Sequence, residues 1–233
     1  MSKIVKIIIG VIVFCIGFYI GSGLAIEENN KKIELPIWKK KPVIYLYPEE
    51  EINIDVKIPN IEFTTTYPKY ENGWSVIAQP DGTLIDFNGR KYNYLYWEGK
   101  SYDFEPDSSK GFIVSKDNYI EFLEEKLDYI GLSSKESADF ISYWLPYMNE
   151  YNYCLVSFQM ENYSKAVNIE YSIEPDNELR VFVLFKGLDK PIKIEEQDLS
   201  YYSNFERSGF TVLEWGGGVI NKFCKYRWYY YGK

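Results

Sequence analysis

The sequence predicts an α+β protein that is mostly β: an N-terminal transmembrane helix, then an antiparallel β-sandwich or meander domain with a central helix pair. Residues 7–26 form an uncharged apolar run, and a helix of this length spans the roughly 30 Å hydrocarbon core of a bilayer. Short alternating segments separated by turn signals fill most of the rest, and two helical patterns lie between about residues 117 and 145. We therefore divide the chain into a transmembrane anchor (1–26), a polar linker (27–41) and a β-rich domain (42–233).

We interpret residues 7–26 as a membrane anchor that is not cleaved, because the run is longer than the roughly 7–15 apolar residues of a signal-peptide core. The alternative is a cleaved signal peptide, with Gly23-Leu24-Ala25 as a small-residue cleavage site. A buried helix of a soluble protein is disfavoured, because the run has no polar face.

The charges beside the run bear on its orientation. Lys3 and Lys6 precede it, as in exported chains, and favour a cytoplasmic N-terminus. Five lysines between residues 31 and 41 favour the opposite orientation if positive charges alone are counted. We assign these lysines to contacts with anionic lipid head groups. The prediction is a single-pass cell-membrane protein, inserted through residues 7–26, with an extracytoplasmic domain.

Composition excludes several classes of function. All 34 acidic residues and 24 of the 26 basic residues follow Ile26, so the domain carries about −10, which disfavours nucleic acid as a partner. The chain has no histidine, which removes Ser-His-Asp and Cys-His catalysis and His-ligated zinc. We expect no cofactor and no metal. Cys154 and Cys224 are either one disulfide of an exported domain or two buried thiols.

The strands of the first half follow from alternation and turns. Apolar residues alternate with polar ones from Ile52 to Ile58, the clearest half-buried strand. Pro80-Asp81-Gly82 and Asn88-Gly89 are strong turn signals. The remaining strands predicted in this half are 43–47, 63–67, 74–78, 84–87 and 92–97.

Two helices follow in the middle of the chain. Ser115 is the predicted cap of a helix from about Asp117 to Ile130, which Gly131 ends. Ser133 and Glu136 have the spacing of a capping box for a second helix, which we expect to end near Leu145, before Pro146.

Strands are predicted again after the helices, at 153–158, 166–173, 179–185, 192–194 and 210–215, and the aromatic tail from 223 to 231 is a candidate last strand. We expect Arg180 on a solvated strand face. Gly216-Gly217-Gly218 lacks the Lys and Ser or Thr of a phosphate loop, and we expect a flexible turn there.

Several segments together resemble a known group of proteins. They are KPVIYLYP at 41–48, GW at 73–74, PDGTL at 80–84, YLYWEG at 94–99, YWLP at 143–146, RVFVLFKGLDKP at 180–191 and GFTVLEWGG at 209–217. In this order they resemble a widespread set of uncharacterised bacterial proteins that are often exported or tethered to a membrane. The resemblance covers nearly all of the domain and implies no activity, cofactor or catalytic residue.

Two carboxylates stand beside tryptophans and are the candidate catalytic residues. Glu98 follows Trp97, and Glu214 precedes Trp215. A glycosidase needs two carboxyl groups across the scissile bond, and aromatic rings beside them suit sugar rings. Burial against tryptophan would raise a carboxyl pKa toward that of a general acid. The alternative is that both residues end strands and bond to turns or pair with Lys or Arg.

Aromatic residues are the candidate ligand-binding groups. Tyr92, Tyr94 and Tyr96 alternate along one predicted strand, and such a strip on an extracellular domain favours glycans or peptides. The binding candidates are Tyr94, Tyr96, Trp97 and Trp215, with core packing as the alternative. Asp81, Asp86 and Asn88 do not have the spacing of a calcium loop, so we interpret them as turn residues.

From these observations we expect a binding or structural role at the cell surface, with a glycan or a protein as partner. The alternative is a carboxylate-dependent enzyme that acts on cell-wall glycan.

Overall fold

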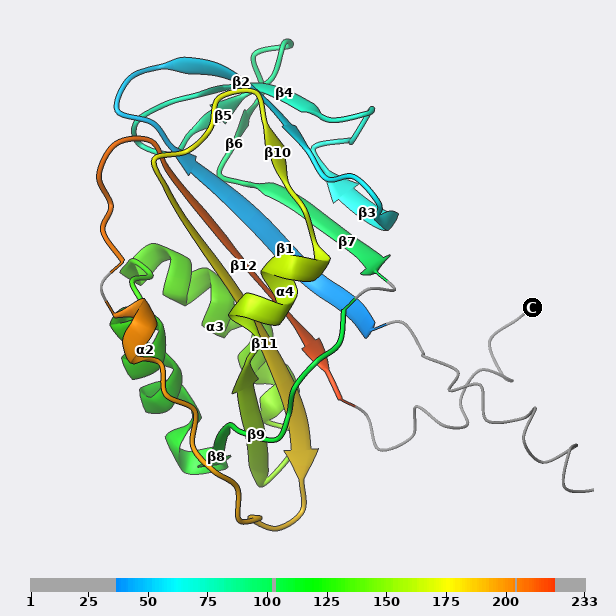
Figure 1. The fold of residues 1–233 in the computed structure, drawn as a ribbon, viewed down its shortest axis with the longest axis vertical. Coiled ribbons are helices and arrows are strands. Elements are labelled where there is room, and N and C mark those ends of the chain that lie inside the picture. Colours follow the sequence, from blue (N-terminus) through cyan, green and yellow to red (C-terminus); the bar gives the residue numbers. More distant parts are fainter. Residues whose placement is uncertain (1–36, 102–103, 204, 221–233) are drawn as a thin grey trace, which may run out of the picture. The chain divides into compact units, whose positions relative to one another are not determined.

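The computed structural model describes residues 37–220, except 102–103 and 204. These residues form two β-sheets with helices (Figure 1), so the expectation of a mostly β domain with some helices is confirmed. The predicted membrane span at 7–26 and the candidate strand at 223–231 lie outside the described residues. Among the described residues, no helix combines the length and apolarity needed to cross a bilayer.

The larger sheet has seven strands in the order β3-β7-β1-β12-β11-β9-β8. Its strands are β1 (Ile37–Tyr47), β3 (Glu62–Tyr67), β7 (Leu95–Ser101), β8 (Phe112–Ser115), β9 (Tyr153–Phe158), β11 (Asn177–Leu188) and β12 (Thr211–Val219). β1 thus includes residues 37–41 of the predicted linker.

The larger sheet is mixed, so the predicted antiparallel sandwich or meander is confirmed only as a mostly β domain with antiparallel and mixed sheets. β11 and β12 run parallel, and their pairing extends from Asn177 opposite Thr211 to Phe185 opposite Val219. Residues 189–210 connect the end of β11 to the beginning of β12. A connection of this length lets the chain return to the same end of the sheet, as parallel strands require.

The smaller sheet is antiparallel, with the order β10-β2-β4-β5-β6. Its strands are β2 (Ile52–Lys57), β4 (Trp74–Ala78), β5 (Leu84–Ile85), β6 (Lys91–Tyr92) and β10 (Glu170–Tyr171). Ile54 and Trp74 from this sheet share one apolar cluster with Ile44, Trp97 and Phe182 from the larger sheet. The two sheets therefore bury a common core.

The other face of the larger sheet packs against helices. A 3₁₀ turn, η1 (Lys116–Asn118), leads into α2 (Tyr119–Tyr129), and α3 (Ser134–Met148) follows. Leu127, Phe140 and Trp144 from the helices join Val183 and Trp215 from the sheet in a second apolar cluster. The larger sheet thus separates two cores.

The helix boundaries test the capping predictions. The capping box of Ser133 and Glu136 is present, and Gly131 follows α2 with φ of 102°. Ser115 precedes η1 without a side-chain cap bond, so its predicted role is wrong. Pro146 lies inside α3, which ends at Met148.

Two strands predicted in the second half are corrected. Residues 160–166 form a short helix, α4 (Met160–Ala166), and only Glu170–Tyr171 of the predicted strand at 166–173 is β. Residues 192–194 are not a strand; they precede a second 3₁₀ turn, η2 (Ser200–Tyr202).

The three glycines at 216–218 are not a turn. They lie within β12 and are buried. A Cβ on Gly217 would lie 2.5 Å from Cζ2 of Trp144 and 2.7 Å from the carbonyl oxygen of Val183. The glycines therefore allow α3 and the neighbouring strands to approach the backbone closely.

Candidate functional site

The alternation of β7 assigns its side chains to two faces of the larger sheet. Trp97 belongs to the core shared with the smaller sheet, while Tyr94 and Tyr96 pack against the core on the helix side. Because successive side chains of a strand point to opposite faces, Glu98 shares the face of Tyr96.

β12 shows the same division. Val43 of β1 pairs with both Tyr96 and Trp215, so Trp215 shares the helix face with Tyr96. Glu214, the neighbour of Trp215, points to the opposite face. Glu98 and Glu214 therefore lie on opposite faces of the sheet and do not flank one bond, so the predicted catalytic pair is wrong.

Glu214 is instead part of a buried hydrogen-bonded cluster. Its side chain is fully buried and accepts hydrogen bonds from Arg180 Nε at 2.8 Å, Tyr163 Oη at 2.9 Å and Trp97 Nε1 at 3.2 Å. Arg180 Nη1 also donates to the carbonyl of Val167 at 2.6 Å. Arg180, which we expected on a solvated face, is 8% exposed. These contacts make Glu214 a structural residue, as the alternative interpretation proposed.

Glu98 lies beside a β-bulge that positions a lysine. The pairing of β1 with both neighbouring strands shifts register just before Val43, and Lys41 in the bulge has φ of 48°. The backbone amide of Lys41 donates to Glu98 Oε1 at 3.3 Å. Bulges often redirect a side chain next to a functional site, and a positive φ in a non-glycine residue is a strained conformation found at such sites.

The ammonium group of Lys41 lies between aromatic rings. Its Nζ is 4.8 Å from the ring centre of Tyr143 and 5.7 Å from that of Trp215. Partial burial lowers the pKa of Lys41, and the nearby carboxylate of Asp139 opposes this shift. Contacts of a cation with aromatic faces favour the charged amine.

The tyrosines around Lys41 remain protonated at neutral pH. Burial raises the pKa of Tyr96 and of Tyr143, and the Glu98 carboxylate raises both further. Tyr94 packs edge-on against Tyr45 with ring centres 5.5 Å apart. Burial raises the pKa of Tyr94 as well. Phenols held neutral in this way are hydrogen-bond donors.

We name this group the tyrosine face, and its members are Lys41, Tyr94, Tyr96, Glu98, Asp139 and Tyr143. Each is half-buried, neither fully exposed nor in the core. Strand β1, strand β7 and helix α3 contribute them, except Tyr94, which directly precedes β7. In Figure 1, α2 and α3 lie toward the β11-β9 side of the larger sheet, and β7 and β3 lie on the other side. An aromatic surface with a cation and two carboxylates at its border can hold a polar ligand that also has an apolar face.

The binding candidates therefore divide into two groups. Tyr94 and Tyr96 are in the tyrosine face, but Trp97 and Trp215 are fully buried. For these two tryptophans core packing is the correct interpretation, since Trp215 lies inside the apolar cluster on the helix side and Trp97 inside the cluster shared with the smaller sheet. Tyr92 packs with the other core, so it does not continue the strip of Tyr94 and Tyr96.

Other predicted residues have structural roles or lie outside the described part. Asp81 Oδ1 accepts from the amide of Thr83, and Asp86 Oδ1 accepts from the amides of Asn88 and Arg90, as turn residues do. Cys154 is buried, and Cys224 lies outside the described residues. Among the described residues no cluster of His, Cys, Asp and Glu has the geometry of a metal site.

Sequence reasoning missed Lys41, Asp139 and Tyr143. Lys41 was assigned to the linker, and the bulge that positions it depends on pairing with two distant strands. Asp139 and Tyr143 are one helical turn apart, the spacing that places side chains on one helix face. That spacing was the available signal, but it does not reveal which strands this face of the helix packs against.

Comparisons with known proteins give one partial match. An uncharacterised protein in the bglA 3′ region of Butyrivibrio fibrisolvens is 41% identical over 64 residues, which are 25% of this chain and 65% of that protein. No family model matches the chain. No solved structure matches it.

Proposed function

We propose that this protein is a single-pass membrane protein whose extracytoplasmic domain binds a cell-surface saccharide on the tyrosine face. The observation that carries the proposal is the position of Tyr94 and Tyr96. They lie half-buried on one sheet face beside Lys41, Glu98 and Tyr143. Flat aromatic rings pack against sugar rings, and the carboxylates and phenols around them match hydroxyl groups.

The resemblance noted in the sequence supports this choice of surface. Three of the resembling segments supply the tyrosine face: Lys41 begins KPVIYLYP, Tyr94 to Glu98 lie in YLYWEG, and Tyr143 begins YWLP. We infer that the chain belongs to that set of exported or tethered bacterial proteins, and that residues 7–26 are its transmembrane helix.

The alternative function, hydrolysis of cell-wall glycan, rested on Glu98 and Glu214 as a catalytic pair. The sheet separates these residues, and Glu214 is bonded to Arg180, Tyr163 and Trp97. No other observation favours hydrolysis over binding.

Binding is tested by calorimetric titration of the detergent-solubilised full chain with soluble peptidoglycan fragments. We expect Tyr96→Ala to weaken binding about tenfold, because the loss of one aromatic contact removes about 1.4 kcal/mol. Tyr129→Ala is the matched control, since Tyr129 is a partly exposed tyrosine on α2, outside the tyrosine face. The proposal is wrong if the native chain binds none of the fragments, or if both variants weaken binding equally.

A further inference from the structure

The first half of β11 has an unpaired outer edge. β9 pairs only with Val183 to Leu188 of β11. The carbonyl of Phe182 faces this edge and accepts from the amide of Gln159 at 2.7 Å, whereas the carbonyl of Phe185 faces β12 and accepts from Ile220. Because peptide groups alternate in direction along a strand, those of Glu178 and Arg180 face the outer edge.

The peptide groups of Glu178 and Arg180 have no hydrogen-bond partner on this edge within the part of the chain that the structure describes. A row of free amide and carbonyl groups on an edge strand is a template for another extended segment. Main-chain pairing at such an edge is one of the standard ways in which proteins hold extended peptides.

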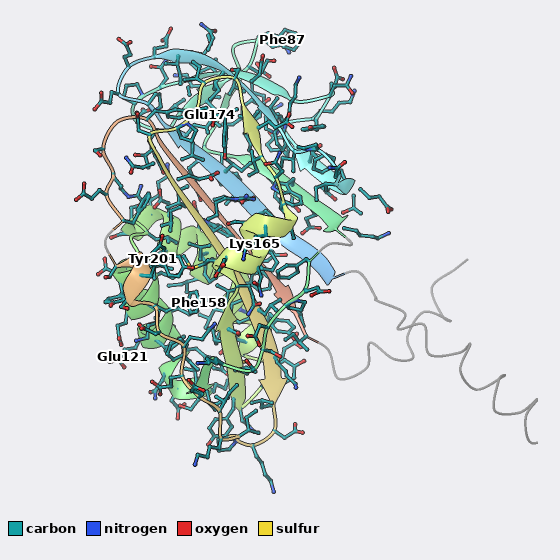
Figure 2. All side chains as sticks on the ribbon, viewed as in Figure 1. Phe87, Glu121, Phe158, Lys165, Glu174 and Tyr201 are labelled. Atoms are coloured by element: carbon teal, nitrogen blue, oxygen red, sulfur yellow. The ribbon has the colours of Figure 1, made fainter. Side chains whose placement is uncertain are left out.

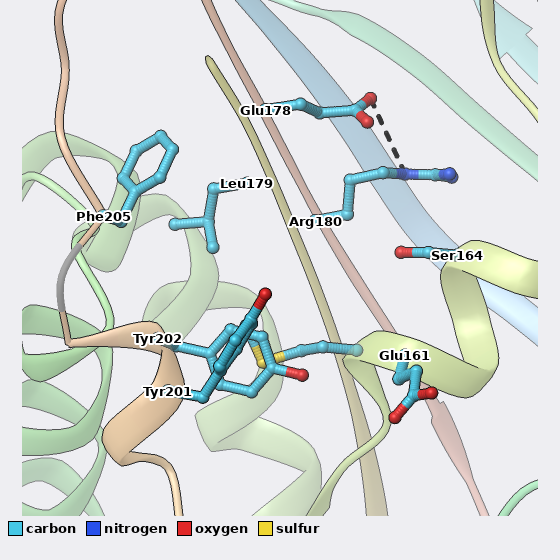
Figure 3. A pocket seen from close by; sticks show the side chains of 9 residues that line it. Glu161, Ser164, Glu178, Leu179, Arg180, Tyr201, Tyr202 and Phe205 are labelled. Atoms are coloured by element: carbon cyan, nitrogen blue, oxygen red, sulfur yellow. Dashed lines mark ion pairs between the residues drawn. The ribbon is translucent and has the colours of Figure 1, made fainter.

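A pocket of about 370 Å³ lies along this edge. α4 and η2 border it, and Figure 3 shows Glu178 and Arg180 on one side of β11 with Leu179 on the other. Tyr201 at the border is 85% exposed and is labelled at η2 in Figure 2. The other aromatic lining residues are Tyr202 and Phe205. The pocket thus offers backbone bonding groups together with aromatic side chains.

The chain itself contains a segment with matching chemistry. Residues 221–233, which lie outside the described residues, carry four basic and no acidic residues, whereas residues 27–220 carry 34 acidic and 20 basic ones. Six of the thirteen tail residues are Phe, Tyr or Trp, residue types that favour strands. Glu161 and Glu178 line the pocket and pair there with Lys165 and Arg180, so the net acidic charge of the domain, rather than an unpaired carboxylate in the pocket, attracts a basic segment.

We propose that the C-terminal tail, residues 221–233, docks as an extended segment along the free edge of β11 in the same chain. The tail is long enough to reach this edge. Ile220 is bonded to Phe185, seven residues along β11 from Glu178, which is about 23 Å at strand spacing. The free edge also lies about 10 Å across the sheet from β12, because β12 and β9 flank β11 on opposite sides. Thirteen extended residues reach about 43 Å, which leaves several residues to pair with the edge.

The native Cys224 of the tail allows a crosslinking test in the full chain. Ser164, on α4, lines the pocket and is exposed. With Ser164→Cys and Cys15→Ser in the detergent-solubilised chain, mild oxidation is expected to join position 164 to Cys224 within one chain. The matched control is Ser142→Cys, which places a thiol on exposed Ser142 in the groove between α2 and α3. Cys154 is fully buried and stays native in both chains.

Mass spectrometry of the digested chains measures the yield of each disulfide. The proposal predicts a yield at position 164 about tenfold above that at position 142, and Tyr201→Ala should reduce it. Glu161→Cys, at a second exposed position of the pocket, gives the same comparison should Ser164→Cys not fold. Equal yields at pocket and control positions, no disulfide with Cys224, or disulfides only between two chains would each overturn the proposal.

Discussion

At the scale of single residues, Glu214 shows how a charged side chain becomes part of a core. It is fully buried, yet three donors from three elements, Arg180, Tyr163 and Trp97, satisfy its oxygens. Transfer of a lone carboxylate from water into an apolar core is very costly. Glu214 and Arg180 can therefore be buried only because they form an ion pair with each other.

We predict that Glu214→Gln lowers the free energy of unfolding by about 3–5 kcal/mol, because it leaves the buried Arg180 without its counter-charge. Urea denaturation followed by tryptophan fluorescence measures the change. Glu161→Gln is the control, since Glu161 pairs with Lys165 at the surface, where solvent screening leaves such a pair with little effect on stability. Similar losses for the two variants would show that the buried pair has no special role in stability.

A second buried carboxylate, Glu136, connects distant segments. Arg207 donates to it and to the carbonyl of Gly131, and Tyr47 Oη donates at 2.7 Å. Burial favours the protonated form, but these donors outweigh it and the pKa of Glu136 is lowered. Glu136, the partner of Ser133 in the capping box of α3, thereby also fixes the loop that leads into β12.

At the scale of elements, β12 is central because its glycines allow close packing. A Cβ on Gly217 would overlap Trp144, and a Cβ on Gly216 would press tightly on Pro42. A run of glycines in a loop would make the chain flexible, but the same run in a central strand lets a tryptophan lie directly on the backbone.

We expect Gly217→Ala to destabilise the domain by about 1–3 kcal/mol, because the added methyl group overlaps Trp144 and the backbone of Val183. Thermal unfolding followed by circular dichroism measures this. Gly89→Asn is the comparison: Gly89 has φ of 77° and open space around its Cβ position, and asparagine tolerates that conformation. Equal effects of the two changes would contradict the packing argument.

At the scale of the whole molecule, one large sheet organises the domain. It has the helices on one face and the smaller sheet with α4 on the other. Its central strands are buried on both faces, which explains why β11 and β12 are apolar almost throughout. The tyrosine face lies on the helix side of this sheet, where residues of β1 and β7 meet Asp139 and Tyr143 of α3.

The proposed membrane anchor belongs to this scale as well. We predict that the full chain stays with membranes after carbonate extraction, because the proposed transmembrane helix at residues 7–26 would place an uncharged segment in lipid, whereas a chain that begins at Glu27 should be found in the aqueous fraction. Protease added to intact cells should digest the domain of the full chain. If the full chain with its first thirty residues intact is found in the aqueous fraction, the predicted location is wrong.

The sequence was most informative where structure depends on near neighbours. β4 and β9 have the predicted bounds, the capping box of Ser133 and Glu136 is present, and Gly82 and Gly89 adopt positive φ in turns. Caps, turns and alternation are decided within a few residues of the chain, so a local pattern suffices to predict them.

Only the tertiary structure decided what depends on distant partners. Arg180 and Glu214 are 34 residues apart, and Lys41 and Glu98 are 57 apart. Whether each charge faces water or a core depends on which strand lies beside it. The sequence by itself therefore determined a mostly β domain with two long helices. Only the complete sheet brings together on one surface Lys41, Tyr96, Glu98 and Tyr143, because long-range strand pairing sets the environment of each side chain.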